Sequence, residues 1–300
     1  TSYFEVIASP SVYGTQTIRA SVLAENAAQP LIRFVVHYYG KSGGLERLEG
    51  DAIQLRHGIN ALTWRIPDLG GAPIYRVGLI LEAETRMRGK VVLTKMDWAG
   101  SPQALEMGSA YDLSPNISPF DTSTYWIRSF VSSARHFGPD ITGTFCLSHP
   151  TNDGVITTGT REWGDYVVAS RLTPELFKTA GLVARARGHR RYLAGVLQDG
   201  FARIIRRIDQ QVDILAQVPF AHEAGVAVVF SMAVQGERIV FEVGDAVRLE
   251  ASDQRLVSGG AGFLIEEGTV PALGFSVHEL ATGQNIDDIA RRDVSARSYA

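Results

Sequence analysis

Residues 181–208 read GLVARARGHRRYLAGVLQDGFARIIRRI, and this stretch is the clearest indication of the architecture. It contains three apolar runs of strand length, separated by two short polar turns, Gly188-His189 and Asp199-Gly200. Asp-Gly between two such runs is typical of a two-residue β-hairpin turn, because both turn positions favour residues that tolerate positive φ. The stretch therefore predicts three consecutive antiparallel strands.

The same alternation of short apolar runs and turn residues continues in both directions along the chain. Strands of this length and spacing, without an intervening helix, are typical of a sandwich or jelly roll. After residue 154 about ten strands in succession predict a large antiparallel sandwich. The other expected strands lie at 16–23, 31–39, 61–66, 75–82, 90–98, 165–172, 212–218, 226–234, 238–243, 246–250, 259–265 and 273–280.

Length and composition predict two domains. At roughly 150 residues per domain, 300 residues suffice for two separate cores. Residues 101–123 change in character, with three prolines (Pro102, Pro115 and Pro119) among Gly, Ser and Asn, and we expect the linker at 109–124. The predicted domains are residues 1–108 and 125–282, followed by a polar tail at 283–300. Within 125–134, the spacing of Trp126, Phe130 and Ala134 favours a short helical turn over a strand.

Composition excludes several functional classes. The net charge of −3 argues against a nucleic-acid binder, which usually carries a basic excess. A single cysteine, Cys146, excludes an intrachain disulfide and any multi-cysteine metal site. The chain has neither an apolar run of about 18 residues nor the layout of a signal peptide, so we expect no membrane association and a cytoplasmic location. Because the first residue is Thr1, we expect the chain to be part of a longer or processed protein.

Sequence motifs for catalysis are absent or weak, which leaves open whether the chain is an enzyme. The nucleotide-binding glycine motifs, the nucleophile elbow and C-x-x-C do not occur. Paired carboxylates would suit glycoside hydrolysis, although solvated turn carboxylates are the simpler interpretation. A structural Ca²⁺ site on turn aspartates is a further candidate. The carboxylate pairs are Asp209 with Asp213, Glu242 with Asp245, and Glu266 with Glu267, and the Ca²⁺ candidates are Asp97, Asp121 and Asp165.

Arginines are concentrated in the strands of the opening stretch. Arg185 and Arg187 are two residues apart, so a regular strand projects them from one face. Arg203 and Arg207 share a face of the strand at 201–208, and neighbouring strands would join the four into one patch. Guanidinium groups bind phosphate or carboxylate through paired hydrogen bonds. The alternative is a solvated face on which Asp and Glu from adjacent strands pair with the arginines.

Aromatic residues beside polar ones give a second set of ligand candidates. Sugar-binding sandwiches stack a pyranose ring on an exposed Trp or Tyr, and polar side chains then fix its orientation. Trp98 beside Asp97, Trp163 and Tyr192 have this composition. Core packing is the alternative role for each aromatic residue.

Several motifs together resemble multidomain bacterial proteins of the ADP-ribosylglycohydrolase family. In the second half they are TGTREWGDY at 158–166, AGLVAR at 180–185 with RRY at 190–192, VQG at 234–236 and GGAG at 259–262. In the first half they are FEVIASPSVY at 4–13, WRIPDLGG at 64–71 and LTKMDWAGSP at 93–102. The likeness covers most of residues 1–282. This sequence departs from the family pattern at Leu93-Thr94, where the family favours Leu-Asp.

The resemblance implies an all-β region in two parts, a galactose-binding-like jelly roll and then a concanavalin/laminin-G-like antiparallel β-sandwich. It also implies an all-helical, Mg²⁺-dependent hydrolase domain upstream, none of whose acidic motifs occurs in this chain. We therefore expect this chain to be a non-catalytic region that belongs to a hydrolase. The region would bind a carbohydrate, glycoconjugate or ADP-ribosyl-type ligand and so increase the local concentration of substrate for the enzyme. Two alternatives remain open, a glycoside hydrolase that uses paired carboxylates and a purely structural module that supports a homo-oligomer.

Overall fold

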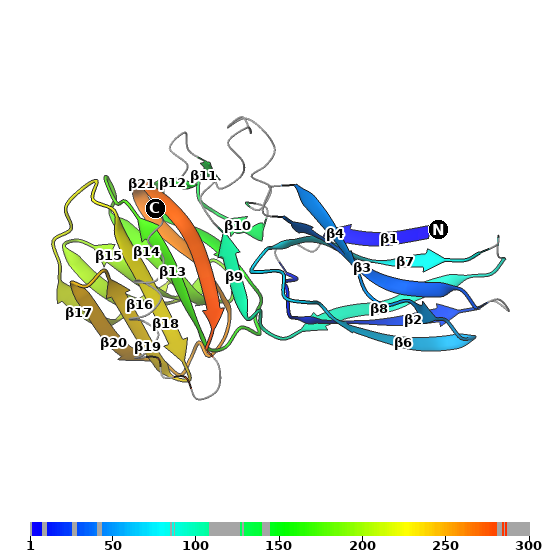
Figure 1. The fold of residues 1–300 in the computed structure, drawn as a ribbon. Coiled ribbons are helices and arrows are strands. Elements are labelled where there is room, and N and C mark those ends of the chain that lie inside the picture. The colour runs from blue at the N-terminus through cyan, green and yellow to red at the C-terminus, as the bar shows by residue number, and fades with distance from the viewer. Residues whose placement is uncertain are drawn as a thin grey trace.

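The computed structural model describes residues 2–7, 11–25, 29–40, 44–84, 86, 88–107, 127, 129–139, 145–280, 284 and 286. These residues form two all-β bodies, which Figure 1 shows next to each other. The predicted all-β class, with one sandwich after another, is confirmed. Within the described residues, no helix has the length and apolarity needed to cross a membrane.

The first sandwich consists of a five-stranded and a three-stranded sheet. Alternate residues of the strands point inward, and Ile18, Phe34, Leu62 and Val77 are among the buried core residues, with at most 3% of their surface exposed. The strand bounds of the larger sheet are β1 (Ser2–Ile7), β7 (Ile74–Glu82), β3 (Leu31–Tyr39), β4 (Leu45–Glu49) and β5 (Ile53–Gln54). Those of the smaller sheet are β6 (Gly58–Arg65), β2 (Thr17–Ala24) and β8 (Val91–Ala99).

The second sandwich has two antiparallel layers that share two long strands, β12 (Phe145–Thr158) and β21 (Gly260–Glu279). The first half of β21 pairs with β14, and its second half pairs with β13. One layer continues through β14 (Thr179–Ala186), β15 (Arg191–Gln198), β16 (Phe201–Ile208) and β17 (Gln211–Pro219). The other continues through β13 (Tyr166–Leu172), β18 (Val228–Gln235), β19 (Arg238–Val243) and β20 (Val247–Ser252). Short strands β9 (Ala104–Met107), β10 (Val131–Ser132) and β11 (His136–Pro139) pair with β21 or β12.

A local distortion allows β21 to pass from one layer to the other. Glu267 has a φ of 45° at this point. A Cβ atom on the next residue, Gly268, would lie 2.1 Å from the carbonyl oxygen of Leu176, so only glycine fits there without a shift. The partner strand β12 has its own register shift, between His149 and Asp153. Sequence patterning predicted two strands here, 259–265 and 273–280, whereas the structure has one continuous strand.

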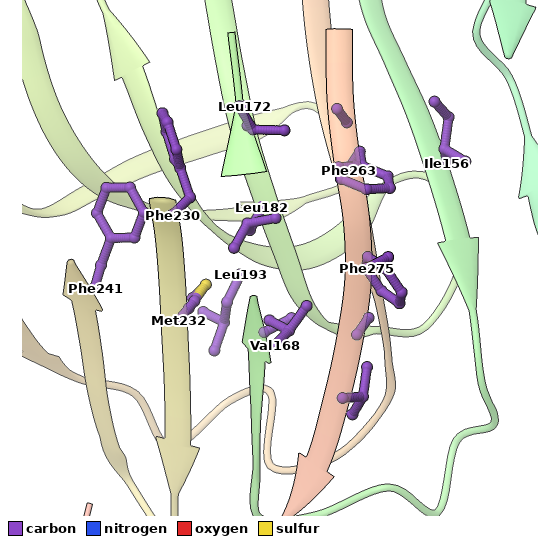
Figure 2. Packing of buried hydrophobic residues seen from close by; sticks show 14 of the residues in the cluster. Ile156, Val168, Leu172, Leu182, Leu193, Phe230, Met232, Phe241, Phe263 and Phe275 are labelled. Atoms are coloured by element: carbon purple, nitrogen blue, oxygen red, sulfur yellow. The ribbon is translucent and has the colours of Figure 1, made fainter. Parts of the chain in front are cut away.

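Aliphatic and aromatic side chains fill the space between the two layers of the second sandwich (Figure 2). Phe230 and Phe241 come from neighbouring strands, and their ring centroids are 5.9 Å apart. Phe263 and Phe275, both on β21, have ring centroids 5.1 Å apart. The Phe241 ring reaches β15 in the opposite layer, where a Cβ atom on Gly195 would lie 2.2 Å from it. Gly195 thus lets the layers approach closely.

The predicted hairpin around Asp199-Gly200 is confirmed. Asp199 and Gly200 have φ values of 51° and 77°, as a turn with two positive φ angles requires. The turn pairs Gln198 with Phe201, and this register carries through β15 and β16. It sets which side chains of the two strands share a face.

A buried tyrosine joins the two sandwiches. Tyr13, from the first, has 1% of its surface exposed. Its hydroxyl lies 2.7 Å from Thr158 Oγ1 and accepts a hydrogen bond of 2.6 Å from the Gly159 N–H. The Tyr13 ring also packs edge-on against Trp163 with a centroid distance of 5.0 Å. These contacts make the two sandwiches one packed unit at this point.

Some expected boundaries differ from the structure. Strand β9 pairs with β21, so Ala104–Met107 belongs to the second sandwich, although the predicted first domain extends to residue 108. Val131–Ser132 pairs with β12 as a strand where a helical turn was expected, although Ile127 and Ser129 do have 3₁₀ geometry. The predicted linker at 109–124 and most of the tail at 283–300 lie outside the described residues.

Tyr13→Phe is expected to lower the free energy of unfolding by about 1–3 kcal/mol, because Thr158 and Gly159 would keep buried polar groups with one partner fewer. Urea unfolding followed by tryptophan fluorescence measures this change. Tyr38→Phe is the matched control, since Tyr38 donates a surface hydrogen bond to Glu46, and we expect a change within about 0.5 kcal/mol. Equal effects of the two substitutions would contradict the role assigned to Tyr13.

Candidate functional site

The face of strands β14–β17 that points away from the core carries the candidate site, and we call it the outer face. Residues alternate between the core and this face, so Leu182 and Leu193 belong to the core while Val183 and Ala194 do not. The outer face has a buried floor of small and aliphatic residues under its polar side chains. The floor consists of Val155, Val183, Ala186, Ala194, Val196, Ile205 and Leu264, none with more than 7% of its surface exposed.

Five polar side chains form a continuous chain of hydrogen bonds across the outer face, and we call them the polar row. Each comes from a different strand: Glu266 from β21, Thr179 from β14, Gln198 from β15, Arg203 from β16 and Gln217 from β17. Thr179 Oγ1 donates to Glu266 Oε2 over 2.8 Å and accepts from Gln198 Nε2 over 2.9 Å. Arg203 continues the row, donating from Nη1 to Gln198 Oε1 over 2.6 Å and from Nε to Gln217 Oε1 over 3.1 Å. These hydrogen bonds between neighbouring strands therefore fix the positions of the five side chains relative to one another.

The polar row keeps unused bonding capacity at its surface. Among the described residues, Arg203 Nη2 and Gln217 Nε2 have no hydrogen-bond partner, so both can donate to a ligand. Asp199 adds a carboxylate beside Arg203, at 3.4 Å from Nη1, and 60% of its side chain is exposed. The Arg203 guanidinium also lies 5.0 Å from the centre of the Phe201 ring. Donors, acceptors and an aromatic ring therefore meet within one small surface.

A second polar cluster lies further along the same face and consists of Asp153, Tyr192 and Arg207. Arg207 forms an ion pair with Asp153, and the Tyr192 hydroxyl donates to Asp153 Oδ2 over 3.3 Å. Burial and the nearby charge of Glu266 raise the pKa of Tyr192 well above its usual value. The phenol consequently stays protonated and remains a donor at neutral pH.

The charges around the polar row nearly cancel. Lys178 Nζ lies 2.8 Å from Glu266 Oε1 and 3.3 Å from Glu267 Oε1, and these bonds raise the pKa of Lys178. Two cations, Lys178 and Arg203, therefore face three carboxylates, those of Asp199, Glu266 and Glu267. The cluster around Asp153 adds one charge of each sign. With one negative charge in excess, this surface suits a neutral, hydroxyl-rich ligand better than an anion.

A pocket of about 300 Å³ opens where strands β15 and β16 meet at their turn. Three separate segments line it: the residues that lead into β14, the β15–β16 turn, and the residues that follow β17. The Phe220 N–H donates to the Gly200 carbonyl over 2.9 Å, which ties the last segment to the turn. The lining residues include Phe177, Lys178, Gln198, Asp199, Phe201 and Phe220.

The structure does not gather the four predicted arginines into one patch. Arg185 has a φ of 51° at a register shift in β14, which breaks the alternation and turns the side chain inward, where it is 0% exposed. Its guanidinium donates to Leu256 O and pairs with Asp165, and Arg187 bonds to Ser258. Arg203 and Arg207 do share the outer face, and acidic side chains pair with both. This arrangement matches the alternative interpretation, in which neighbouring carboxylates neutralise the arginines.

The predicted aromatic platforms are mostly covered. Trp163 and Tyr192 are each 1% exposed, so neither offers a free ring face to a sugar in this structure. Trp98 is half-buried and packs against the core of the first sandwich. Its neighbour Asp97 lies 2.6 Å from Lys95 and 3.5 Å from Arg19, and these cations lower its pKa.

The two predicted Ca²⁺ residues that the structure describes, Asp97 and Asp165, do not come together. Asp97 is in the first sandwich, Asp165 pairs with Arg185 and the Gly236 N–H in the second, and Asp121 lies outside the described residues. Among the residues that the structure describes, no group of three His, Cys, Asp or Glu is arranged to hold a metal ion.

The predicted carboxylate pairs are bound to basic side chains. Asp209 pairs with Arg191 and Asp213 with Arg206, and these arginines lower the pKa of both carboxyl groups. A general acid for glycoside hydrolysis needs a raised pKa, which this pair lacks. Glu242 and Glu266 are ion-paired with Arg248 and Lys178.

The similarity of this chain to known proteins is distant, with TM-scores below 0.5 for the three solved structures named below. No protein-family model matches the chain, and no curated protein matches it. A carbohydrate-binding module, CBM66 from Bacillus subtilis, is 12% identical with a TM-score of 0.44, and the match covers 48% of this chain and 91% of the module. A Bacillus subtilis protein of unknown function with a galectin-like fold is 12% identical with a TM-score of 0.42, over 51% of this chain and 90% of that one. The exoplasmic/lumenal domain of VIP36, in a Ca²⁺/Man3GlcNAc-bound form, is 9% identical with a TM-score of 0.40, and the match covers 53% of this chain and 87% of that domain.

Thr179→Val is expected to lower the free energy of unfolding by about 1–3 kcal/mol, because it removes the donor to Glu266 and the acceptor for Gln198 at a site that is 2% exposed. The matched control is Thr269→Val. Thr269 is exposed and bonds to the Ser148 hydroxyl, so a change within about 0.5 kcal/mol is expected. Urea unfolding compares the two, and a harmless Thr179→Val would show that the polar row is not a connected unit.

Proposed function

We propose that this chain binds a neutral carbohydrate on the outer face of β14–β17. The observation that carries the proposal is the polar row, in which donors and acceptors alternate across five strands. A sugar hydroxyl both donates and accepts, so a neighbouring pair such as Arg203 and Asp199 can bond to a single hydroxyl from both sides. Backbone pairing fixes the strands beneath, so little conformational entropy is lost on binding.

The charge balance favours glycans over ADP-ribosyl-type ligands. A pyrophosphate needs cations that are free to pair with it, and arginine usually supplies them. On this face Arg203 is next to Asp199, Arg207 pairs with Asp153, and Lys178 pairs with two glutamates. An anionic ligand would have to displace these carboxylates and would also face the excess negative charge.

A finer proposal concerns the protein to which this region belongs. The sequence resemblance supports an ancillary role beside a helical, Mg²⁺-dependent hydrolase of the ADP-ribosylglycohydrolase family. In that arrangement, glycan binding by this chain would hold the catalytic domain near its substrate. The reading frame upstream of Thr1 tests this part of the proposal, which predicts a helical domain rich in acidic motifs there.

A glycan array that includes neutral and acidic oligosaccharides, together with free ADP-ribose, tests the binding proposal. We expect neutral glycans to bind, and Arg203→Ala to weaken that binding by about 10- to 100-fold, which corresponds to the loss of one or two charge-assisted hydrogen bonds. Calorimetric titration with the best array ligand measures the change.

Arg248→Ala is the matched control for this substitution. Arg248 is likewise an arginine held by carboxylates, those of Glu242 and Glu250, but it lies in the other layer of the sandwich. Its removal should leave glycan affinity unchanged. Equal losses in the two variants, preferential binding of ADP-ribose, or binding of no array member would each overturn the proposal. Turnover of a bound glycan would instead favour the hydrolase alternative.

A further inference from the structure

We propose that the pocket beside the β15–β16 turn receives the terminal sugar of a glycan chain, so that the protein recognises chain ends rather than chain interiors. This inference rests on the proposed glycan binding and adds to it the part of the glycan that is recognised. It starts from the position of the pocket, because Gln198 and Asp199 line the pocket and also bond to Arg203. The pocket and the polar row are therefore continuous.

The chemistry of the pocket differs from that of the polar row. Three aromatic rings, those of Phe177, Phe201 and Phe220, contribute to its walls, whereas the row is made of hydrogen-bonding side chains. A pyranose has apolar C–H faces as well as hydroxyls, so aromatic walls with polar groups at the margin suit a whole ring that is enclosed on several sides. The row suits a sugar that lies flat on a surface and contacts the protein on one side only.

The size of the pocket limits its occupant. Its volume of about 300 Å³ is at the lower end of the range for small-molecule sites, which is roughly 300–1,000 Å³. It matches a single sugar residue better than a segment of chain. A sugar in the interior of a glycan would also need two openings in the pocket, one for each neighbouring sugar. A terminal sugar needs only one opening, toward the polar row.

The direction of strands β15 and β16 gives the path of the rest of the glycan. Moving away from the turn along β15 and β16, the outer face presents Gln198 and Phe201, then Val196 and Arg203, then Ala194 and Ile205, and then Tyr192 and Arg207. The six residue-to-residue steps from Gln198 to Tyr192 span about 20 Å at roughly 3.3 Å per residue. A short oligosaccharide with its end in the pocket can thus cross the polar row at Gln198 and Arg203 and extend along the strands toward the cluster around Asp153.

Binding stoichiometry on polymers tests this inference directly. Mannan, galactan, xylan and a soluble β-glucan of known chain length, each with its own oligosaccharides, are titrated into the protein by calorimetry. For the polymer that binds, we expect about one protein per chain end, whatever the chain length. More than one bound protein per chain end would overturn chain-end recognition and leave the proposed glycan binding intact. The absence of binding to every glycan tested here and on the array would count against the proposed function itself.

Ala221→Trp provides a second, independent readout. Ala221 is an exposed residue of the pocket wall that belongs to neither the core nor the polar row, so a tryptophan there should fill the pocket without unfolding the chain. We expect at least a tenfold loss of oligosaccharide affinity. Ala246→Trp, at an exposed alanine outside the pocket, is the control and should bind as the wild type does. Wild-type affinity in Ala221→Trp would contradict the inference.

Discussion

The bend in β21 is the constraint on which the second sandwich depends. Strand β21 pairs with β14 before the bend and with β13 after it, so a single strand joins both layers. The bend needs the positive φ of Glu267 and the missing Cβ of Gly268, which lets the Leu176 carbonyl come close. It also places Glu266, the last residue before the bend, at the start of the polar row. The architecture and the candidate site therefore share one backbone feature.

On the outer face, oppositely charged side chains lie in pairs above a buried, apolar floor. Each cation of this face has a carboxylate within ion-pair distance, as Lys178, Arg203 and Arg207 illustrate. What remains at the surface is hydrogen-bonding capacity rather than net charge. That combination is suited to hydroxyl groups, and it argues for a carbohydrate over a phosphate-bearing ligand.

Sequence patterning predicts much of this fold and part of the site. The Asp199-Gly200 turn determines that Gln198 faces Phe201, and counting from it brings Gln198 and Arg203 close together. The position of Gln217 opposite Arg203 depends on a register shift between β16 and β17, which counting does not predict. The polar row as a whole is not predicted, because arginines and aromatic residues stand out in a sequence as ligand candidates, whereas Thr179, Gln198 and Gln217 become neighbours only through strand register. Glu266 was identified only as half of an adjacent pair.

Other features depend on geometry that alternation does not encode. The φ of 51° at Arg185 reverses the direction expected for its side chain, and a strand pattern gives no indication of this. Trp163 is buried because Tyr13 of the other sandwich packs on it, a contact between residues 150 positions apart in sequence. Strand β9 joins the second sandwich for a similar reason, since its partner lies near the end of the described chain.

Mapping of backbone amide resonances during titration with a neutral oligosaccharide would locate the ligand on the molecule. We predict that shift changes concentrate at Thr179, Gln198, Arg203 and Gln217 and around the Asp199-Gly200 turn, while β18–β20 stay unchanged. Changes confined to β18–β20 or to the first sandwich would contradict it, because the ligand would then bind away from the polar row.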